Sequence, residues 1–186
     1  MQKIKIPTLR KELKEYNQTE LITLIVDLFK MNKEVQQYLS SKFLGDEVNE
    51  ELHKQLRKKI ENEFFPERSL PKLRLTDLEK MILSFQKTTE DPIRTIDLML
   101  YYVEMGVDFT RSYGDMGDKF YNKILSMFAK LVDLCEEDEA YYTPYAERLS
   151  DLLSNSMEIA WGFPDVLSEI YYSIPWIEEE EEEEEE

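Results

Sequence analysis

The stretch Asp91–Glu104 reads DPIRTIDLMLYYVE, and it decides the fold class. Asp91 suits the N-cap of a helix and Pro92 suits the first helical position, so a helix begins here. Inside it, the run LMLYYV is apolar on every side of a helix. A helix of this kind is buried by neighbours all round. We therefore expect a central helix that runs from Pro92 to about Phe109.

Caps, prolines and apolar spacing predict shorter helices on both sides of this one. Thr8, Thr19 and Asn32 are expected to cap the first three helices, and Thr143 a later one. The expected helices span residues 8–16, 20–31, 33–44, 47–64, 118–137 and 143–153. A further helix begins at Thr76 or an earlier residue and carries Leu78, Ile82 and Phe85, and a last one is led by Phe163-Pro164. Short connections make neighbours antiparallel. The predicted fold is all-α, either an irregular bundle or a short solenoid-like stack of antiparallel helical hairpins.

Length and composition support this interpretation. The chain has 186 residues with 42% hydrophobic content, enough for one sizeable core. Its five Gly and seven Pro are too few for the many tight turns of an all-β protein. We expect a single helical domain over residues 1–177, in which 1–45 could form a semi-independent N-terminal helical subdomain. Residues 178–186 are all Glu and are expected to be disordered.

The net charge of −17 is unevenly distributed. Residues 1–94 carry 18 basic and 16 acidic side chains, whereas residues 95–186 carry 5 basic and 24 acidic ones. The single cysteine, Cys135, allows no internal disulfide and favours a reducing compartment. The N-terminus lacks a signal-peptide core, and no apolar run approaches the roughly 20 residues of a membrane span. A cytoplasmic location is the expectation.

Four motifs in order resemble a known family. EFFP at Glu63–Pro66 precedes PKLRL at Pro71–Leu75, the stretch from Asp91 to Glu104 follows, and FYNKILSMFAK occupies Phe120–Lys130. Together they resemble a bacterial family known as domain of unknown function 6155, over roughly residues 8–174. The resemblance implies a small all-helical cytoplasmic bacterial protein, and it brings no catalytic residue or ligand with it.

Several residues that often carry chemistry have simpler interpretations here. His53 lacks partners at metal-ligand or triad spacing, so an exposed side chain is expected. Cys135 lies on an apolar helix face beside acidic residues, which suits a core residue better than a reactive thiol. The loop SYGDMGD, Ser112–Asp118, is acidic and would repel phosphate. We expect no cofactor and no metal site.

Asp97 and Glu104 are the most informative polar residues. They lie seven residues apart, two helical turns, on nearly one face of the apolar helix. Two carboxylates on one face could perform acid–base chemistry. More commonly such residues pair with Arg or Tyr to fix packing, and Arg94, Arg111 and Tyr101 are candidates.

Two further surfaces could bind a partner. A basic face over residues 54–74 includes Lys58 and Lys59 and could contact nucleic-acid phosphates, although acidic residues interleave it. The aromatic second half offers Trp161 and Trp176 as anchors for a protein partner, and Trp176 is expected to be exposed.

The sequence thus predicts a non-enzymatic protein-interaction module. Helix faces near Trp161 and Trp176, together with Asp97 and Glu104, would contact a protein partner, and the acidic second half would select a basic one. The alternative is a nucleic-acid-associated protein that uses the basic face, with the glutamate tail as a modulator. A carboxylate enzyme around Asp97 and Glu104 is the third hypothesis. The sequence does not set the oligomeric state.

Overall fold

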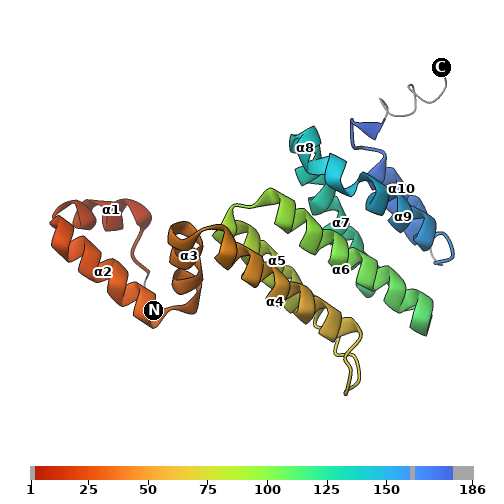
Figure 1. Ribbon diagram of the computed structural model, residues 1–186, viewed down its shortest axis with the longest axis horizontal. Coiled ribbons are helices and arrows are strands. Elements are labelled where there is room, and N and C mark those ends of the chain that lie inside the picture. The colour runs from red at the N-terminus through yellow and green to blue at the C-terminus, as the bar shows by residue number, and fades with distance from the viewer. Residues whose placement is uncertain (1–2, 160–161, 178–186) are drawn as a thin grey trace. The chain divides into compact units, whose positions relative to one another are not determined.

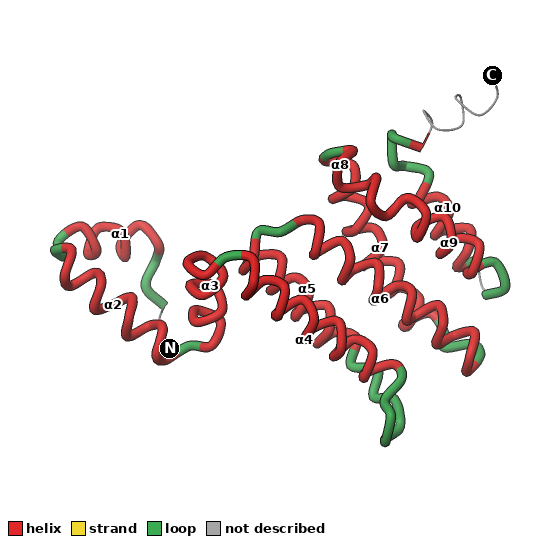
Figure 2. Tube along the Cα trace, in the orientation of Figure 1, coloured by secondary structure: helices red, strands yellow, loops and turns green. Residues whose placement is uncertain are grey.

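The computed structural model describes residues 3–159 and 162–177, and the chain is all-α (Figures 1 and 2). Helices joined by short connections make up this part of the chain, and it contains no strand. The chain divides into two compact units, Met1–Val48 and Asn49–Glu186. The single domain expected over residues 1–177 stays a prediction. The expected disorder of the glutamate tail concerns residues outside the described ones.

The first unit contains three short helices, and two of them begin earlier than predicted. They are α1 (Ile6–Lys14), α2 (Gln18–Met31) and α3 (Lys33–Leu44). Pro7 lies in the first turn of α1, where its fixed φ suits a helix, so Thr8 is not the cap. Asn17, rather than Thr19, caps α2. Its side chain accepts a hydrogen bond from the Glu20 amide, and the Glu20 carboxylate accepts one from the Asn17 amide.

The predicted ends of α3 are confirmed. The Asn32 side chain accepts hydrogen bonds from the amides of the first turn. Gly45 follows the helix with φ 75°, a conformation that glycine adopts without strain.

The second unit contains α4 from Asn49 onward and the helices that follow it. They are α4 (Asp46–Phe64), α5 (Leu75–Thr89), α6 (Pro92–Tyr113), α7 (Asp118–Glu137), α8 (Glu139–Tyr142), the 3₁₀ helix η1 (Thr143–Tyr145), α9 (Ala146–Ser156) and α10 (Phe163–Tyr171). The bounds of α7 and the start of α10 agree with the sequence prediction. The predicted cap at Thr143 is wrong. Asp138 caps a short helix before it, and Thr143 begins the 3₁₀ turn between α8 and α9.

Helix α6 is the centre of this unit, as the sequence predicts. Eleven of its residues are buried, and it packs against α5, α7 and α9. Phe64 of α4 meets Tyr102 of α6 edge to face, with ring centroids 5.8 Å apart. The helix continues to Tyr113, four residues beyond the predicted end. Its partly open face carries the polar residues of the candidate site.

Candidate functional site

The partly open face of α6 carries a row of functional side chains. Asp97, Tyr101, Glu104, Met105 and Asp108 are all half-buried, whereas the residues between them are buried. Their spacing of one to four residues places them along a single stripe of the helix. The buried remainder of α6 holds this stripe in place.

Asp97 receives three hydrogen bonds from two neighbouring helices. Its Oδ2 lies 2.7 Å from His53 Nε2 and accepts a 2.7 Å hydrogen bond from Arg57 Nη1, both on α4. Its Oδ1 accepts a 2.6 Å hydrogen bond from Arg148 Nη1 on α9. Burial by itself would raise the pKa of Asp97, but the hydrogen bonds from His53 and Arg148 and the charge of Arg57 hold that pKa well below its usual range.

Glu104 forms a two-point ion pair with the same arginine. Arg148 Nε and Nη2 donate to the two Glu104 oxygens over 2.9 and 2.7 Å. This fork geometry gives the strongest kind of charge-assisted hydrogen bond. Although burial disfavours the charged form, the hydrogen bonds to Glu104 and Asp97 raise the pKa of Arg148 above its usual value. The guanidinium of Arg57 lies over the Tyr101 ring, 3.7 Å from its centroid, in a cation–π contact.

These contacts correct two expectations. His53 is half-buried and paired with Asp97, not an exposed side chain without partners. The arginines that bind Asp97 and Glu104 are also not the two that the sequence suggested. Arg94 pairs with Asp91 instead. The true partners lie 40 to 51 residues away in the sequence, so only the fold brings them together.

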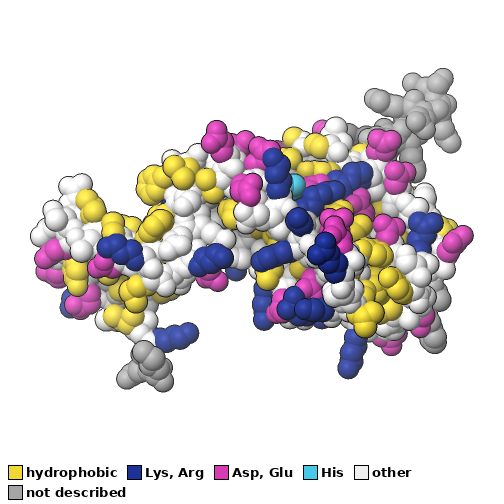
Figure 3. Space-filling view, turned by 60° about the horizontal axis from the view of Figure 1, so that its bottom comes forward, with side chains coloured by type: hydrophobic (Ala, Val, Ile, Leu, Met, Phe, Trp, Pro, Cys, Tyr) yellow, Lys and Arg dark blue, Asp and Glu magenta, His cyan; other side chains and the backbone are white. Residues whose placement is uncertain are grey.

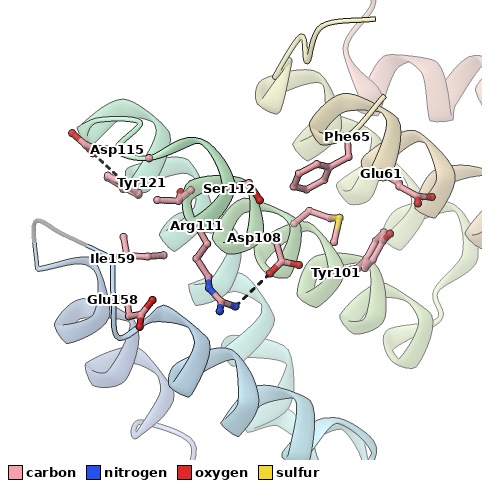
Figure 4. A pocket seen from close by; sticks show the side chains of 13 residues that line it. Glu61, Phe65, Tyr101, Asp108, Arg111, Ser112, Asp115, Tyr121, Glu158 and Ile159 are labelled. Carbon is pink, nitrogen blue, oxygen red and sulfur yellow. Dashed lines mark hydrogen bonds and ion pairs between the residues drawn. The ribbon is translucent and has the colours of Figure 1, made fainter. Parts of the chain in front are cut away.

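A groove of about 820 Å³ opens beside this charge cluster (Figure 4). Its size falls within the range typical of ligand sites. One wall comes from the end of α4 and from α6, and the opposite wall from the segment after α9 (Figure 4). The lining residues are Glu61, Phe65, Tyr101, Met105, Asp108, Thr110, Arg111, Ser112, Gly114, Asp115, Tyr121, Glu158 and Ile159.

The groove is acidic. Four carboxylates line it, those of Glu61, Asp108, Asp115 and Glu158. Arg111 is the one cation among the described lining residues. Its Nη1 lies 4.0 Å from Asp108 Oδ1 and donates to Asn155 over 3.2 Å. The pKa of Asp108 is raised, first by burial and further by the nearby charge of Glu104, while Arg111 opposes this shift. An acidic surface of this kind attracts cations.

Apolar and aromatic surface lies between these carboxylates. Tyr101 projects from α6 and Phe65 directly follows the end of α4 (Figure 4). Met105, one turn after Tyr101, lies on the same side of α6. The Tyr121 hydroxyl donates to Asp115 over 2.9 Å. A smaller hollow of about 210 Å³ adjoins the groove at Met105 and Asp108 and reaches Glu104 and Arg148. The charge cluster and the groove therefore form one continuous site.

The other sequence-derived candidates do not line the groove. Lys58 and Lys59 are exposed on α4, and Lys59 Nζ approaches Met81 Sδ at 4.0 Å. Trp176 is not exposed as expected. It packs against the core, and its indole N–H donates to the Cys135 carbonyl over 2.9 Å. Trp161 lies outside the described residues.

Cys135 is a core residue, as the sequence predicts. It is fully buried, and burial, with the charge of Glu136, raises the pKa of its thiol to about 12. Among the described residues, no group of three or more His, Cys, Asp or Glu could hold a metal ion. Across the same part of the chain, no helix combines the length and apolarity that crossing a membrane requires.

Fold and groove together define the class, an all-α protein with an acidic surface groove. A family model described as a family of unknown function, domain of unknown function 6155, matches residues 4–173, so the chain belongs to this family. The resemblance seen in the sequence motifs is thereby confirmed. No curated protein and no solved structure matches the chain.

Proposed function

We propose that this protein is a non-enzymatic interaction module whose groove binds a basic segment of a protein partner. The observation that carries the proposal is the set of four carboxylates around a groove of about 820 Å³, in which Arg111 is the one cation among the described lining residues. A Lys or Arg side chain suits this surface because it has both an apolar stem and a charged head. The stem would lie on Phe65 and Met105, and the head would reach the carboxylates.

Asp97 and Glu104 are already paired with side chains of the protein itself, and this favours a binding role over the enzyme hypothesis. Both carboxylates are held by Arg148, and Asp97 by His53 and Arg57 as well. A general base needs a carboxylate within reach of a substrate proton. Here the two carboxylates instead join α4, α6 and α9 and stiffen the wall of the groove. We therefore assign them a positioning role.

The basic face supports the nucleic-acid alternative less well. Three of its cations are paired with carboxylates of the chain itself: Lys54 with Glu50, Arg57 with Asp97, and Arg74 with Glu63. Since phosphate binding depends on the number of cations available, this pairing weakens the surface. The interleaved charges on this side of the molecule are visible in Figure 3.

The test is binding of a labelled Arg-Lys-Arg-Lys peptide, followed by fluorescence anisotropy. The chain should also be tested without residues 178–186, because the glutamate tail attracts any basic peptide. We expect replacement of Glu61 and Glu158 by Gln to weaken binding about tenfold, since two partly exposed ion pairs contribute about 0.5–1 kcal/mol each.

A matched control removes two charges elsewhere. Glu137 and Glu147 are exposed and lie outside the groove. Replacing both by Gln should change the affinity less than twofold. If both double variants lost the same affinity for the peptide, binding would depend only on the net charge of the protein, and the proposal would fail. A shift of short duplex DNA at about 50 mM salt would favour the alternative instead.

A further inference from the structure

The described part of the first unit, residues 3–48, forms no apolar core of its own. Helices α1 and α2 contain no buried residue, and the only buried residue of α3 is Ser41. Isolated helices shorter than about 12–15 residues are marginal in water, and packing of an apolar face is what usually stabilises them. These helices have 9, 14 and 12 residues. They therefore need an apolar surface to pack against.

The unit exposes large apolar side chains in unusual number (Figure 3). Of the nineteen exposed large apolar side chains in the described residues, thirteen belong to this unit. They are Ile4, Ile6, Leu9, Tyr16, Ile22, Ile25, Val26, Leu28, Phe29, Met31, Tyr38, Phe43 and Leu44. Scattered apolar residues are normal on a surface, but a dense set marks a place of association.

Helix α2 carries the densest part of this exposed apolar surface. Leu21 and Leu24 are half-buried, and α2 packs against α3. The other apolar side of α2 carries Ile22, Ile25, Val26 and Phe29, which are 38–54% exposed. Their positions, i, i+3, i+4 and i+7, form one continuous stripe. We call these four residues the α2 stripe. It contains no charged side chain.

We propose that the α2 stripe is a homodimer interface, covered by the same stripe of a second copy of this chain. An antiparallel pair of α2 helices would place Ile22 opposite Phe29 of the other copy, and Ile25 opposite Val26. Such a contact is isologous, the common form of a two-fold dimer. No charge would be buried in it, so desolvation would not oppose association.

The exposed apolar area of the whole unit sets the upper limit for the size of a dimer interface. Thirteen large side chains, each roughly half exposed, present on the order of 1,000 Å². A stable interface takes about 800 Å² from each partner. The α2 stripe supplies only part of that area, so the interface would extend from the stripe to other exposed apolar side chains of the unit.

Charge also favours a second copy of this unit as the occupant. Met1–Val48 carries eight basic and seven acidic side chains, so two copies of the unit would meet with little repulsion. The second unit carries fifteen basic and thirty-three acidic ones. Its exposed large apolar side chains are only six in the described residues, and they lie on separate elements: Leu70, Met81, Tyr113, Met157, Val166 and Tyr172. None of them forms a comparable stripe.

The test is the molar mass of the full chain by light scattering over a range of concentrations. A dimer of the 22.3 kDa chain is expected. Ile25→Glu should raise the dissociation constant about a hundredfold or more, because each dimer receives the substitution twice. Thr23→Glu is the matched control, since Thr23 is exposed on the polar side of α2, and it should leave the dimer intact.

Two further measurements separate the outcomes. Ile25→Arg introduces the opposite charge and should also give a monomer, with unchanged thermal unfolding of the second unit. Hydrogen exchange of α2 should be slow in the dimer and fast in the monomeric variants. A parent chain that is monomeric at all concentrations overturns the proposal, and slow exchange in such a monomer would show that the chain covers its own stripe. A complex only with another protein overturns it as well.

Discussion

Arg148 on α9 and Glu104 on α6 are joined at two points, by hydrogen bonds of 2.9 and 2.7 Å between the guanidinium and the carboxylate. The same guanidinium also holds Asp97. One side chain therefore binds two half-buried carboxylates on the central helix, and Arg57 and His53 add further partners for Asp97. The stability of the second unit should depend on it strongly.

Replacing Arg148 by Met should lower the free energy of unfolding by about 1–3 kcal/mol. The loss is less than that of a fully buried pair because the three side chains are partly exposed, but it leaves Glu104 without Arg148 and removes one of the three partners of Asp97. Urea unfolding measures it. Arg148→Lys keeps the charge without the fork geometry and should lose about half as much. A loss below about 0.5 kcal/mol in the Met variant would contradict this account.

Acid should remove the stabilisation that Asp97 provides. The pKa of Asp97 is lowered in the folded chain. Its contribution is therefore fully present above the unfolded pKa of about 3.9, and is lost as the pH falls from there toward the folded pKa. Asp97→Asn should destabilise the protein at about pH 6 and do so less at about pH 3.5.

The control for this pH dependence is Asp133→Asn, at an exposed position of α7. Its effect on the free energy of unfolding should be small and alike at both pH values. If the two variants show the same pH dependence, the ion pairs of Asp97 are not its source.

Gly106 of α6 packs directly against the Ile124 side chain of α7. A Cβ at position 106 would lie 2.5 Å from the Ile124 Cδ1 and 2.9 Å from its Cγ1. Alanine is the better helix former by about 1 kcal/mol, but Ile124 is fully buried and cannot easily move away. Gly106→Ala should therefore destabilise the chain by about 1–2 kcal/mol.

A double-mutant cycle tests this close contact. Ile124→Val removes the Cδ1 atom and should recover part of the loss in the Gly106→Ala background, with a coupling of about 1 kcal/mol. Gly106→Ala with unchanged or increased stability would show that the two helices can separate at no cost.

The sequence predicts correctly those helix ends that depend on residues next to one another in the chain. Asp91 and Pro92 mark the start of α6 because a cap and a proline act on the first turn alone. Other predicted helix starts were wrong, because two nearby residues could each mark the start of the helix. Asn17, and not Thr19, caps α2 because Asn17 and Glu20 form a reciprocal pair of hydrogen bonds. At α1, Pro7 suits a first helical turn, so the helix begins at Ile6 and not after Thr8.

Only part of the candidate site could be predicted from the sequence. Helical spacing correctly placed Asp97 and Glu104 on nearly one face. Their partner Arg148 lies on another helix, 51 and 44 residues away, and no local pattern connects them. The groove itself is assembled from the end of α4, from α6 and from the segment after α9. Since each contributes a few side chains, none carries a recognisable motif.

The burial of α6 limits how this protein can change during evolution. Eleven positions of the helix are fixed by the core, and a rotation that presented new residues to the groove would expose them. Within α6, a change in what the proposed binding groove prefers can therefore arise at the lining positions outside the core, which are Tyr101, Met105, Asp108, Arg111 and Ser112. Relatives with different partners should vary at these positions and in the segment around Glu158, while the apolar sides of α6 stay constant.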